Sequence, residues 1–432
     1  MLDDRLSQLL EWGVASFSSL VFDMDITKHS GYKDFVWAVE LHRISLEVIG
    51  LWPGTDKAAK DNFLSDLRVS VIFVIVTFLS VVPLIWSLVR VWGDMILMID
   101  NLQVTFPLLM VSLKLIIMRW KRTAVSFIVK MMAKDWVELR IDRERYVMIK
   151  RARAARLVMI CGYALMIFAF IVLIILPSFG LHFRYLTNLT DHGRLLPLQA
   201  YYFYDTDKSP QFEFTLVIQT VTMLLGAITY TSVDSFFALT IFHICGQLEN
   251  FRHRLVDLAS RKDFYSILRD NVQTHIQLIR FAGNIENTFT LMMLGLVFYF
   301  GIVFCLYGFL LVTVLVGDNE ISNMSPQRIC FVMIGIVTLL AHTFLYCSAG
   351  EIVKEQCEAV YRTMCNLEWY RLKPKEERTL ILLMIRASEP FRITAGKVFP
   401  LTMTTFCSYV FQLLKTSAGY ISFLLANREI EA

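Results

Sequence analysis

Apolar stretches without a charged residue alternate with charged segments along the chain. A helix needs about 20 apolar residues to cross the core of a bilayer, which is about 30 Å thick. Because lipid offers no partner to free backbone groups, such stretches form helices. Five stretches have this length and contain no charge, at residues 69–89, 157–183, 214–233, 287–317 and 329–350.

Two further apolar stretches contain charged side chains. Residues 95–118 include Asp100 and Lys114, and residues 398–427 include Lys415. Counting both stretches gives seven spans, and an odd number of spans places the two termini on opposite sides of the membrane. The pattern therefore predicts an all-α integral membrane protein with seven transmembrane helices.

The composition agrees with a membrane protein and narrows its chemistry. Hydrophobic residues make up 56% of the 432 residues and charged residues 19%, whereas soluble proteins carry about 25% charged residues. The formal net charge of +4 gives no reason to expect nucleic acid as a partner. The eight cysteines lack the spacing of metal ligands, and the spans lack the clustered His, Asp or Ser of an enzyme site. We expect no enzyme activity, no metal and no cofactor.

The distribution of basic residues orients the spans. Residues 119–156, between the second and third spans, contain twelve Lys or Arg residues against four acidic ones. Loops rich in Lys and Arg stay in the cytosol, and the first residues of the chain are acidic where a signal peptide is basic. We therefore expect a cytosolic N-terminus and an extracellular C-terminus. The same orientation places Asn188 and Asn323, two potential N-glycosylation sites, outside the cell.

The predicted spans divide the chain into five parts. In order, these are a cytosolic N-terminal region, the first six spans, a charged segment, the seventh span and a short extracellular tail, at residues 1–64, 65–350, 351–397, 398–427 and 428–432. The loops at residues 119–156 and 246–284 are expected in the cytosol. The loops at residues 184–212 and 317–328 are expected outside the cell. The charged segment keeps apolar residues among its charges, which predicts a packed layer of intracellular helices that continue the spans.

Short motifs in the C-terminal part resemble the insect odorant receptors. They are Tyr346-Cys347, Gly350-Glu351, Trp369-Tyr370, Pro390, Thr394-Ala395-Gly396-Lys397, Thr405-Phe406, and Leu414-Lys415-Thr416-Ser417 followed by Tyr420. The sequence Gly50-Leu51-Trp52-Pro53, before the first span, resembles the N-terminal region of the same family. Relative to the family pattern, Tyr409 to Gln412 add about one helical turn to the last helix.

The resemblance implies a tetrameric, non-selective cation channel of the plasma membrane that an odorant opens. The last helix would line one central pore, the charged segment would form an intracellular anchor, and each subunit would bind a small volatile hydrophobic ligand in its outer half. Tuning subunits of this family assemble with a shared co-receptor, which has a longer insertion between spans four and five. The short connection in this chain indicates a tuning subunit. Its expected partners are the co-receptor, an odorant, permeant cations and membrane lipid.

Polar and aromatic residues share one face of the seventh span. Thr416, Tyr420, Phe423 and Asn427 are spaced as residues on one side of a helix. An apolar constriction at Phe423 and Leu424 can close a pore by excluding water. We therefore expect these five residues to form the pore and its gate, with ordinary helix packing as the alternative.

The ligand pocket is expected to be apolar and aromatic, as pockets for apolar molecules are. The resemblance places it among the outer halves of spans two, three, four and six. The candidates there are Phe106, Leu109, Phe168, Phe170, Met223, Ala227, Phe331 and Ile334. Packing in the core or against lipid is the alternative for each of them.

Charged and polar residues near the spans are expected to be structural. Asp234 directly follows the fourth apolar stretch, which favours a place at the membrane interface or in the anchor. A lysine facing a cation pore would oppose conduction, so Lys415 is assigned to pairing or to the interface. His342 in the sixth span is assigned to a satisfied polar contact between helices, with a ligand contact or a pH sensor as the alternative.

Other function classes fit the pattern less well. A gustatory-type channel has the same architecture, but its Gln-Phe signature is missing after Tyr420. A G-protein-coupled receptor has an extracellular N-terminus and an outer disulfide, and neither agrees with the charge pattern and the cysteine positions. Transporters often contain internal repeats, and none is evident in this sequence.

The orientation makes a prediction for Asn188. When the chain is expressed in cells, we expect a glycan at this residue, because its loop faces the lumen during synthesis. Glycosidase treatment of the wild type should then increase the mobility of the protein on a gel, and Asn188→Gln should remove that shift. An unglycosylated Asn188, with a glycan acquired by a sequon engineered into residues 119–156, would show the opposite orientation.

Overall fold

The computed structural model describes most of the chain as helices joined by short connections. The described residues are 31–53, 59–139, 141–176, 196–258, 264–316, 326–367, 369–371, 373–408, 411–412 and 415. In chain order the elements are α2 (Gly31–Val48), α3 (Ala59–Val76), η1 (Thr77–Val81), α4 (Val82–Arg90), α5 (Met95–Trp120), α6 (Arg122–Glu138), α7 (Asp142–Phe170), η2 (Ile171–Ile175), α9 (Gln211–Leu258), α10 (Phe264–Val316), α11 (Pro326–Cys365), η3 (Trp369–Arg371), α12 (Pro374–Ala387), β1 (Thr394–Ala395) and β2 (Phe399–Pro400). The two strands pair as a short antiparallel hairpin.

Six helical segments in the described part are long and apolar enough to cross a membrane. They are Phe63–Arg90, Leu97–Trp120, Asp142–Ile175, Gln211–Val256, Ser266–Gly308 and Met333–Cys365. These segments correspond to the first six predicted spans, so the prediction of an all-α membrane protein is confirmed. Of the seventh predicted span, residues 398–427, the beginning lies within the described part and most of the rest lies outside it.

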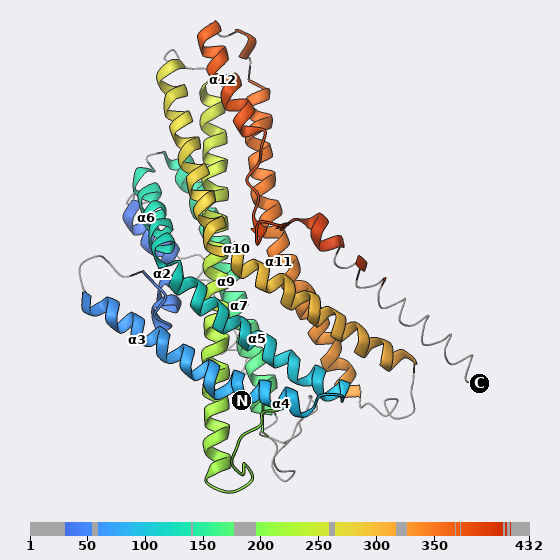
Figure 1. Ribbon diagram of the computed structural model, residues 1–432. Helices are drawn as coiled ribbons and strands as arrows, with labels where there is room; N and C mark the ends of the chain where they lie inside the picture. Colours follow the sequence, from blue (N-terminus) through green and yellow to red (C-terminus); the bar gives the residue numbers. More distant parts are fainter. Residues whose placement is uncertain are drawn as a thin grey trace, which may run out of the picture.

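Two of the spans continue far beyond the thickness of a bilayer. The helix α9 has 48 residues and α10 has 53, which at 1.5 Å per residue corresponds to about 70 and 80 Å. Figure 1 shows their adjoining ends gathered with the end of α11 and with α12 at one end of the molecule. We call this end the anchor end. The charged segment, residues 351–397, contributes the end of α11 and all of α12 to it.

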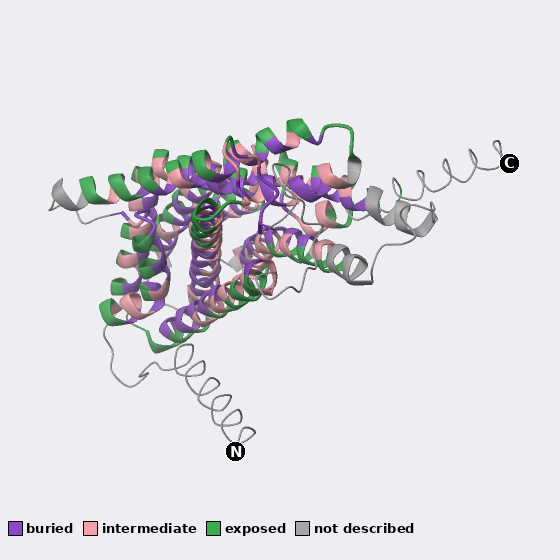
Figure 2. Cartoon of the chain, turned by 90° about the horizontal axis from the view of Figure 1, so that it is seen from below, coloured by how far each residue is buried: buried purple, intermediate pink, exposed green. Residues whose placement is uncertain are grey.

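The spans differ in how much of their surface other helices cover. In the most apolar part of the span on α5, 61% of the residues are buried, against 11% for the span on α7. The helix α5 packs against α9, α10 and α3, whereas α7 turns side chains such as Leu165 and Ile167 outward. Figure 2 shows buried residues between the helices and exposed ones on their outer faces. An outer surface of apolar side chains fits a lipid environment.

The first span is not one regular α-helix. The π-helical segment η1 separates α3 from α4, and Pro83 follows it at the start of α4. Proline lacks an N–H group and its ring clashes with the carbonyl four residues earlier, which interrupts the regular bonding at this point. The hydroxyl oxygens of Thr77 and Ser112 lie 3.1 Å apart, so the irregular segment is tied to the central helix α5.

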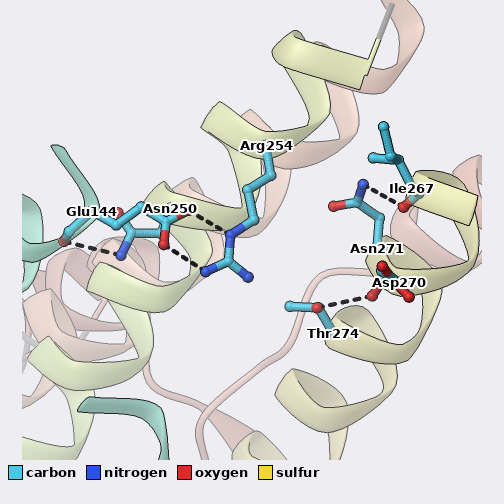
Figure 3. Close-up of polar contacts among 7 residues, drawn as sticks. All are labelled: Glu144, Asn250, Arg254, Ile267, Asp270, Asn271 and Thr274. Carbon is cyan, nitrogen blue, oxygen red and sulfur yellow. Dashed lines mark hydrogen bonds and ion pairs between the residues drawn. The ribbon is translucent and has the colours of Figure 1, made fainter. Parts of the chain in front are cut away.

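Ion pairs join the helices at the anchor end. Residues 119–156, which are expected in the cytosol, form the end of α5, then α6 and the first part of α7. Arg145 on α7 donates to both carboxylate oxygens of Asp34 on α2, at 2.5 and 3.1 Å. The neighbouring Glu144 accepts from Arg254 on α9 at 2.6 and 2.7 Å (Figure 3). Two-pronged arginine contacts of this kind fix geometry, so these residues hold α2, α7 and α9 together.

A buried histidine lies in the same layer. The side chain of His42 on α2 is fully buried, and within the described part of the chain neither ring nitrogen has a hydrogen-bond partner. Burial, and secondarily the nearby Arg156, lower the pKa of His42 from 6.5 to about 3. The folded protein therefore favours the neutral imidazole.

His42 predicts a loss of stability in mild acid. The unfolded chain takes up a proton at His42 near pH 6.5, and the folded chain only near pH 3. The free energy of unfolding is therefore highest above pH 6.5 and decreases as the pH falls below this value. Between pH 7 and pH 5 the expected loss is about 2 kcal/mol. Thermal unfolding of the purified protein should show this loss, and His42→Phe should reduce it. An equal pH dependence in both proteins would contradict this.

Candidate functional site

A charged pair lies inside the helix bundle. The Nζ atom of Lys114 on α5 is 2.5 Å from a carboxylate oxygen of Asp234 on α9, and the Lys114 side chain is completely buried. A charge within the apolar layer is costly unless it is paired, and such charges commonly mark functional sites. The pair explains how Lys114 can interrupt an otherwise apolar span.

The lysine also lies against an aromatic ring. The Nζ atom of Lys114 is 3.2 Å from the ring centroid of Tyr230, one helical turn before Asp234 on α9. A cation over an aromatic face is attracted by the ring electrons, most strongly where water is excluded. The ring of His342 on α11 meets that of Tyr230 edge-on, with 6.2 Å between centroids. Three helices therefore converge on the ion pair.

Aromatic side chains extend the site to α10. The ring of Tyr346, one turn after His342 on α11, lies 6.2 Å from that of Phe300. Next to Phe300, the ring of Tyr299 lies 6.3 Å from that of Phe106 on α5. These contacts bring together residues of four helices, namely Lys114, Tyr230, Asp234, Tyr299, His342 and Tyr346. We call them the buried cluster after Lys114 and Tyr346, which are buried, and the other four are half-buried.

An apolar cavity adjoins the buried cluster on the side of the last helix. Its volume of about 20 Å³ has room for one water-sized group, far below the 300 Å³ or more typical of ligand pockets. Its lining includes Tyr346 and Phe300 as well as Leu401 and Thr405, which lie at the beginning of the last helix. The buried cluster is therefore one layer of side chains away from the segment that leads to the predicted pore.

The predicted ligand residues take different positions. Phe106 and Met223 pack against the hydrophobic core, and the Phe106 ring reaches Tyr299 of the buried cluster. Ala227 and Phe170 are half-buried. The exposed members are Leu109, Phe168 and Ile334, at 36%, 57% and 51% of their surface. The assignment of these residues to a pocket remains a prediction, and Phe106 is the member that touches the buried cluster.

Several predicted residues lie outside the described part of the chain. This holds for the pore and gate residues, for both glycosylation sites and for the side chain of Phe331, that is, for Thr416, Tyr420, Phe423, Leu424, Asn427, Asn188, Asn323 and Phe331. Lys415 lies within the described part of the chain, and its side chain is exposed. His342 bonds the carbonyl of Thr338 on its own helix through Nδ1 at 2.9 Å, so the expected polar contact between helices stays a prediction.

Asp234 is expected at the membrane interface or in the anchor, and the structure pairs it with the buried Lys114 in the middle of α9. The helix α9 continues to Leu258, because polar residues after Asp234 are buried against other helices rather than placed in water, as with Gln247 and Asn250. Sequence reasoning also missed the tyrosines of the buried cluster. The available signal was Lys114 itself, since an unpaired charge in an apolar span requires an acidic partner elsewhere.

The sequence of this chain is similar to a family model and to individual insect proteins. Residues 94–411 match the family model described as 7tm Odorant receptor. The chain is 25% identical to Odorant receptor 10 of Aedes albopictus over 227 residues, covering 51% of this chain and 57% of that protein. It is 25% identical to Odorant receptor Or2 of Anopheles gambiae over 233 residues, covering 51% and 58% respectively. The chain thus matches a little over half the length of these relatives.

The fold is similar to that of a solved olfactory receptor. The insect olfactory receptor OR5 from Machilis hrabei superimposes with a TM-score of 0.78 and 16% identity, over 91% of this chain and 99% of that chain. Its complex with eugenol gives a TM-score of 0.77 and 17% identity, over 92% and 100%. At this level of identity the similarity concerns the fold, and the fold agrees over nearly the whole chain.

The charged pair predicts unequal effects of single and double substitutions. Asp234→Asn leaves the buried Lys114 ammonium without its counter-charge, which typically costs about 3–5 kcal/mol. Lys114→Met combined with Asp234→Leu removes both charges and should restore much of the lost thermal stability and surface expression. Glu138→Gln is the matched control, because Glu138 pairs with Lys134 on the surface and such pairs contribute about 1 kcal/mol or less. A double variant no more stable than Asp234→Asn would contradict the role of pairing.

Proposed function

Because the chain belongs to the 7tm Odorant receptor family, we propose that it is the odorant-binding tuning subunit of a ligand-gated, non-selective cation channel in the plasma membrane. One observation carries the proposal: the matched region extends from the start of α5 to the start of the last helix. It therefore contains the whole buried cluster and the segment that connects this cluster to the predicted pore.

The proposed ligand is a small, mostly apolar molecule. Phe106 and Met223 offer apolar surface next to the core, and the tyrosines of the buried cluster offer a few polar groups nearby. Pockets for small molecules combine these two features, with the polar groups fixing the orientation of the ligand. The solved relative in complex with eugenol supports this ligand class.

The proposed assembly is a tetramer with the odorant co-receptor. Residues 259–263 alone separate α9 from α10, and this short connection supports a tuning subunit rather than the co-receptor. In the proposed assembly the last helix of each subunit lines the pore, with Thr416, Tyr420, Phe423, Leu424 and Asn427 as pore and gate residues. The N-terminus and the anchor end face the cytosol.

The proposed opening step begins at the buried cluster. A ligand beside Phe106 changes the packing of the rings on α10 and α11, because protein interiors are packed too densely to absorb an added group without a shift. Tyr346 lines both the buried cluster and the small cavity next to Leu401. A shift of α11 therefore reaches the start of the last helix directly. Cations then pass through the central pore.

Electrical recording tests this proposal. Cells that express the chain with an insect odorant co-receptor should give a cation current in response to one or more members of a panel of volatile apolar compounds. Co-expression is required because the proposed pore is shared between the two kinds of subunit. Whole-cell current under voltage clamp is the measurement, and cells with the co-receptor alone are the control.

Two results would contradict the proposal. One is a ligand response that requires intracellular GTP and persists after external permeant cations are removed. Such a response would indicate G-protein signalling in place of a channel. The other is a chain that reaches the cell surface but neither associates with the co-receptor nor changes its currents across the panel.

A further inference from the structure

The inner half of α11 forms a continuous contact with the beginning of the last helix. The rings of Phe344 and Phe406 meet edge-on with 5.6 Å between centroids. One turn later, the Ser348 hydroxyl lies 3.7 Å from the Met403 sulfur. After another turn, Glu351 accepts the backbone N–H of Met403 at 3.1 Å. These α11 residues follow each other at helical spacing, so they lie on one face of the helix.

The backbones come very close at the end of this contact. A Cβ atom on Gly350 would lie 2.0 Å from the carbonyl oxygen of Leu401, so no side chain fits at position 350. Thr402 begins the helical turn that follows, and its hydroxyl accepts the N–H of Thr405 at 3.3 Å, as an N-terminal cap does. We call residues 401–405 the root of the last helix.

The Glu351 carboxylate is held in place from its own helix. Lys354, three residues later on α11, lies 3.1 Å from one carboxylate oxygen of Glu351, and the other oxygen accepts the Met403 N–H. A charged acceptor makes a stronger bond to a backbone N–H than a neutral one does. Glu351 therefore provides a directed, charge-assisted link between α11 and the root.

The chain before the root is held from α10. Glu286 accepts the backbone N–H of Thr394 at 3.0 Å and also bonds its hydroxyl. The carbonyl of Thr290 accepts the N–H of Gly396 at 2.9 Å, so the hairpin of β1 and β2 is attached to α10. The root itself is attached to α11 through Glu351. The connection to the last helix therefore has two parts. The hairpin is attached to α10, and the root is attached to α11.

We propose that Glu351 is a positioning residue of the channel, which fixes the root of the last helix to α11 and passes movements of α11 on to that helix. The inference rests on the proposed function. Tyr346 of the buried cluster precedes Glu351 by five residues, about 8 Å along the helix axis. A shift of α11 at the buried cluster therefore displaces the root by way of the Glu351 carboxylate.

Removing the carboxylate tests the attachment without requiring a current. In Glu351→Ala, hydrogen–deuterium exchange of residues 401–408 in the purified full-length chain should be about tenfold faster than in the wild type. Glu351→Gln keeps an acceptor and should fall between the two. The matched control is Glu358→Ala, because Glu358 lies 3.9 Å from the same Lys354 and bonds no residue of the root. Equal exchange in Glu351→Ala and the wild type would overturn the proposal.

The same link can be removed from its other end. Met403→Pro removes the N–H donor, at the first helical position where proline is well tolerated. Met403→Leu keeps the donor and removes only the sulfur contact. Exchange at residues 404–408 should rise in the proline variant and not in the leucine variant, and Glu351→Ala should add little to Met403→Pro. Fully additive effects would show that the two residues act independently and would overturn the link.

Recording with the co-receptor tests the transmission of movement. In Glu351→Ala, the maximum odorant-evoked current should fall about tenfold relative to the current evoked by a co-receptor agonist, at equal surface expression. Glu358→Ala should match the wild type. An unchanged maximum in Glu351→Ala, with a normal wild-type response, would overturn the inference and leave the proposed function intact. A wild type that reaches the cell surface but neither associates with the co-receptor nor changes its currents would instead overturn the proposed function. The exchange results would still decide whether Glu351 holds the root.

Discussion

A charge inside an apolar bilayer needs a partner from the same protein, and this constraint sets how the central helices meet. The side chain of Lys114 on α5 is fully buried, and Asp234 on α9 is its partner. A buried pair adds little net stability, but either charge alone is costly. The helices α5 and α9 must therefore meet at this depth and in this register. Once they do, Tyr230 lies against the ammonium group, and the rings of α10 and α11 pack around it.

The existence and approximate limits of the six described spans could be predicted from the sequence, because the thickness of the bilayer fixes the length of an apolar helix. The partner of Lys114 could not, since Asp234 is 120 positions away and the apolar pattern does not say which helices are neighbours. The same limit applies to the pocket. Phe168 and Met223 both stand in apolar spans, yet the first is exposed and the second packs on the core. A helix that is apolar all round does not reveal which face turns to lipid.

The two ends of the bundle are held by different interactions. Around the Lys114–Asp234 pair, apolar and aromatic contacts dominate, whereas the anchor end is joined by several arginine–carboxylate pairs such as Arg145 with Asp34. The basic residues that indicated a cytosolic segment are thus partly structural. The directed geometry of the Arg145–Asp34 pair places α2 against α7. The anchor end in this way joins the ends of the long helices α9, α10 and α11.

Some of the short motifs that suggested a family lie at the root of the last helix and in the hairpin before it. Gly350 admits the carbonyl of Leu401, and Glu351 bonds the N–H of Met403. Gly396 has a φ of 64°, which glycine adopts without strain, and a Cβ atom there would lie 2.8 Å from Leu294. Where backbone meets backbone only particular residues fit, whereas many apolar residues can face lipid. A recognisable pattern is therefore expected at this junction between the bundle and the last helix.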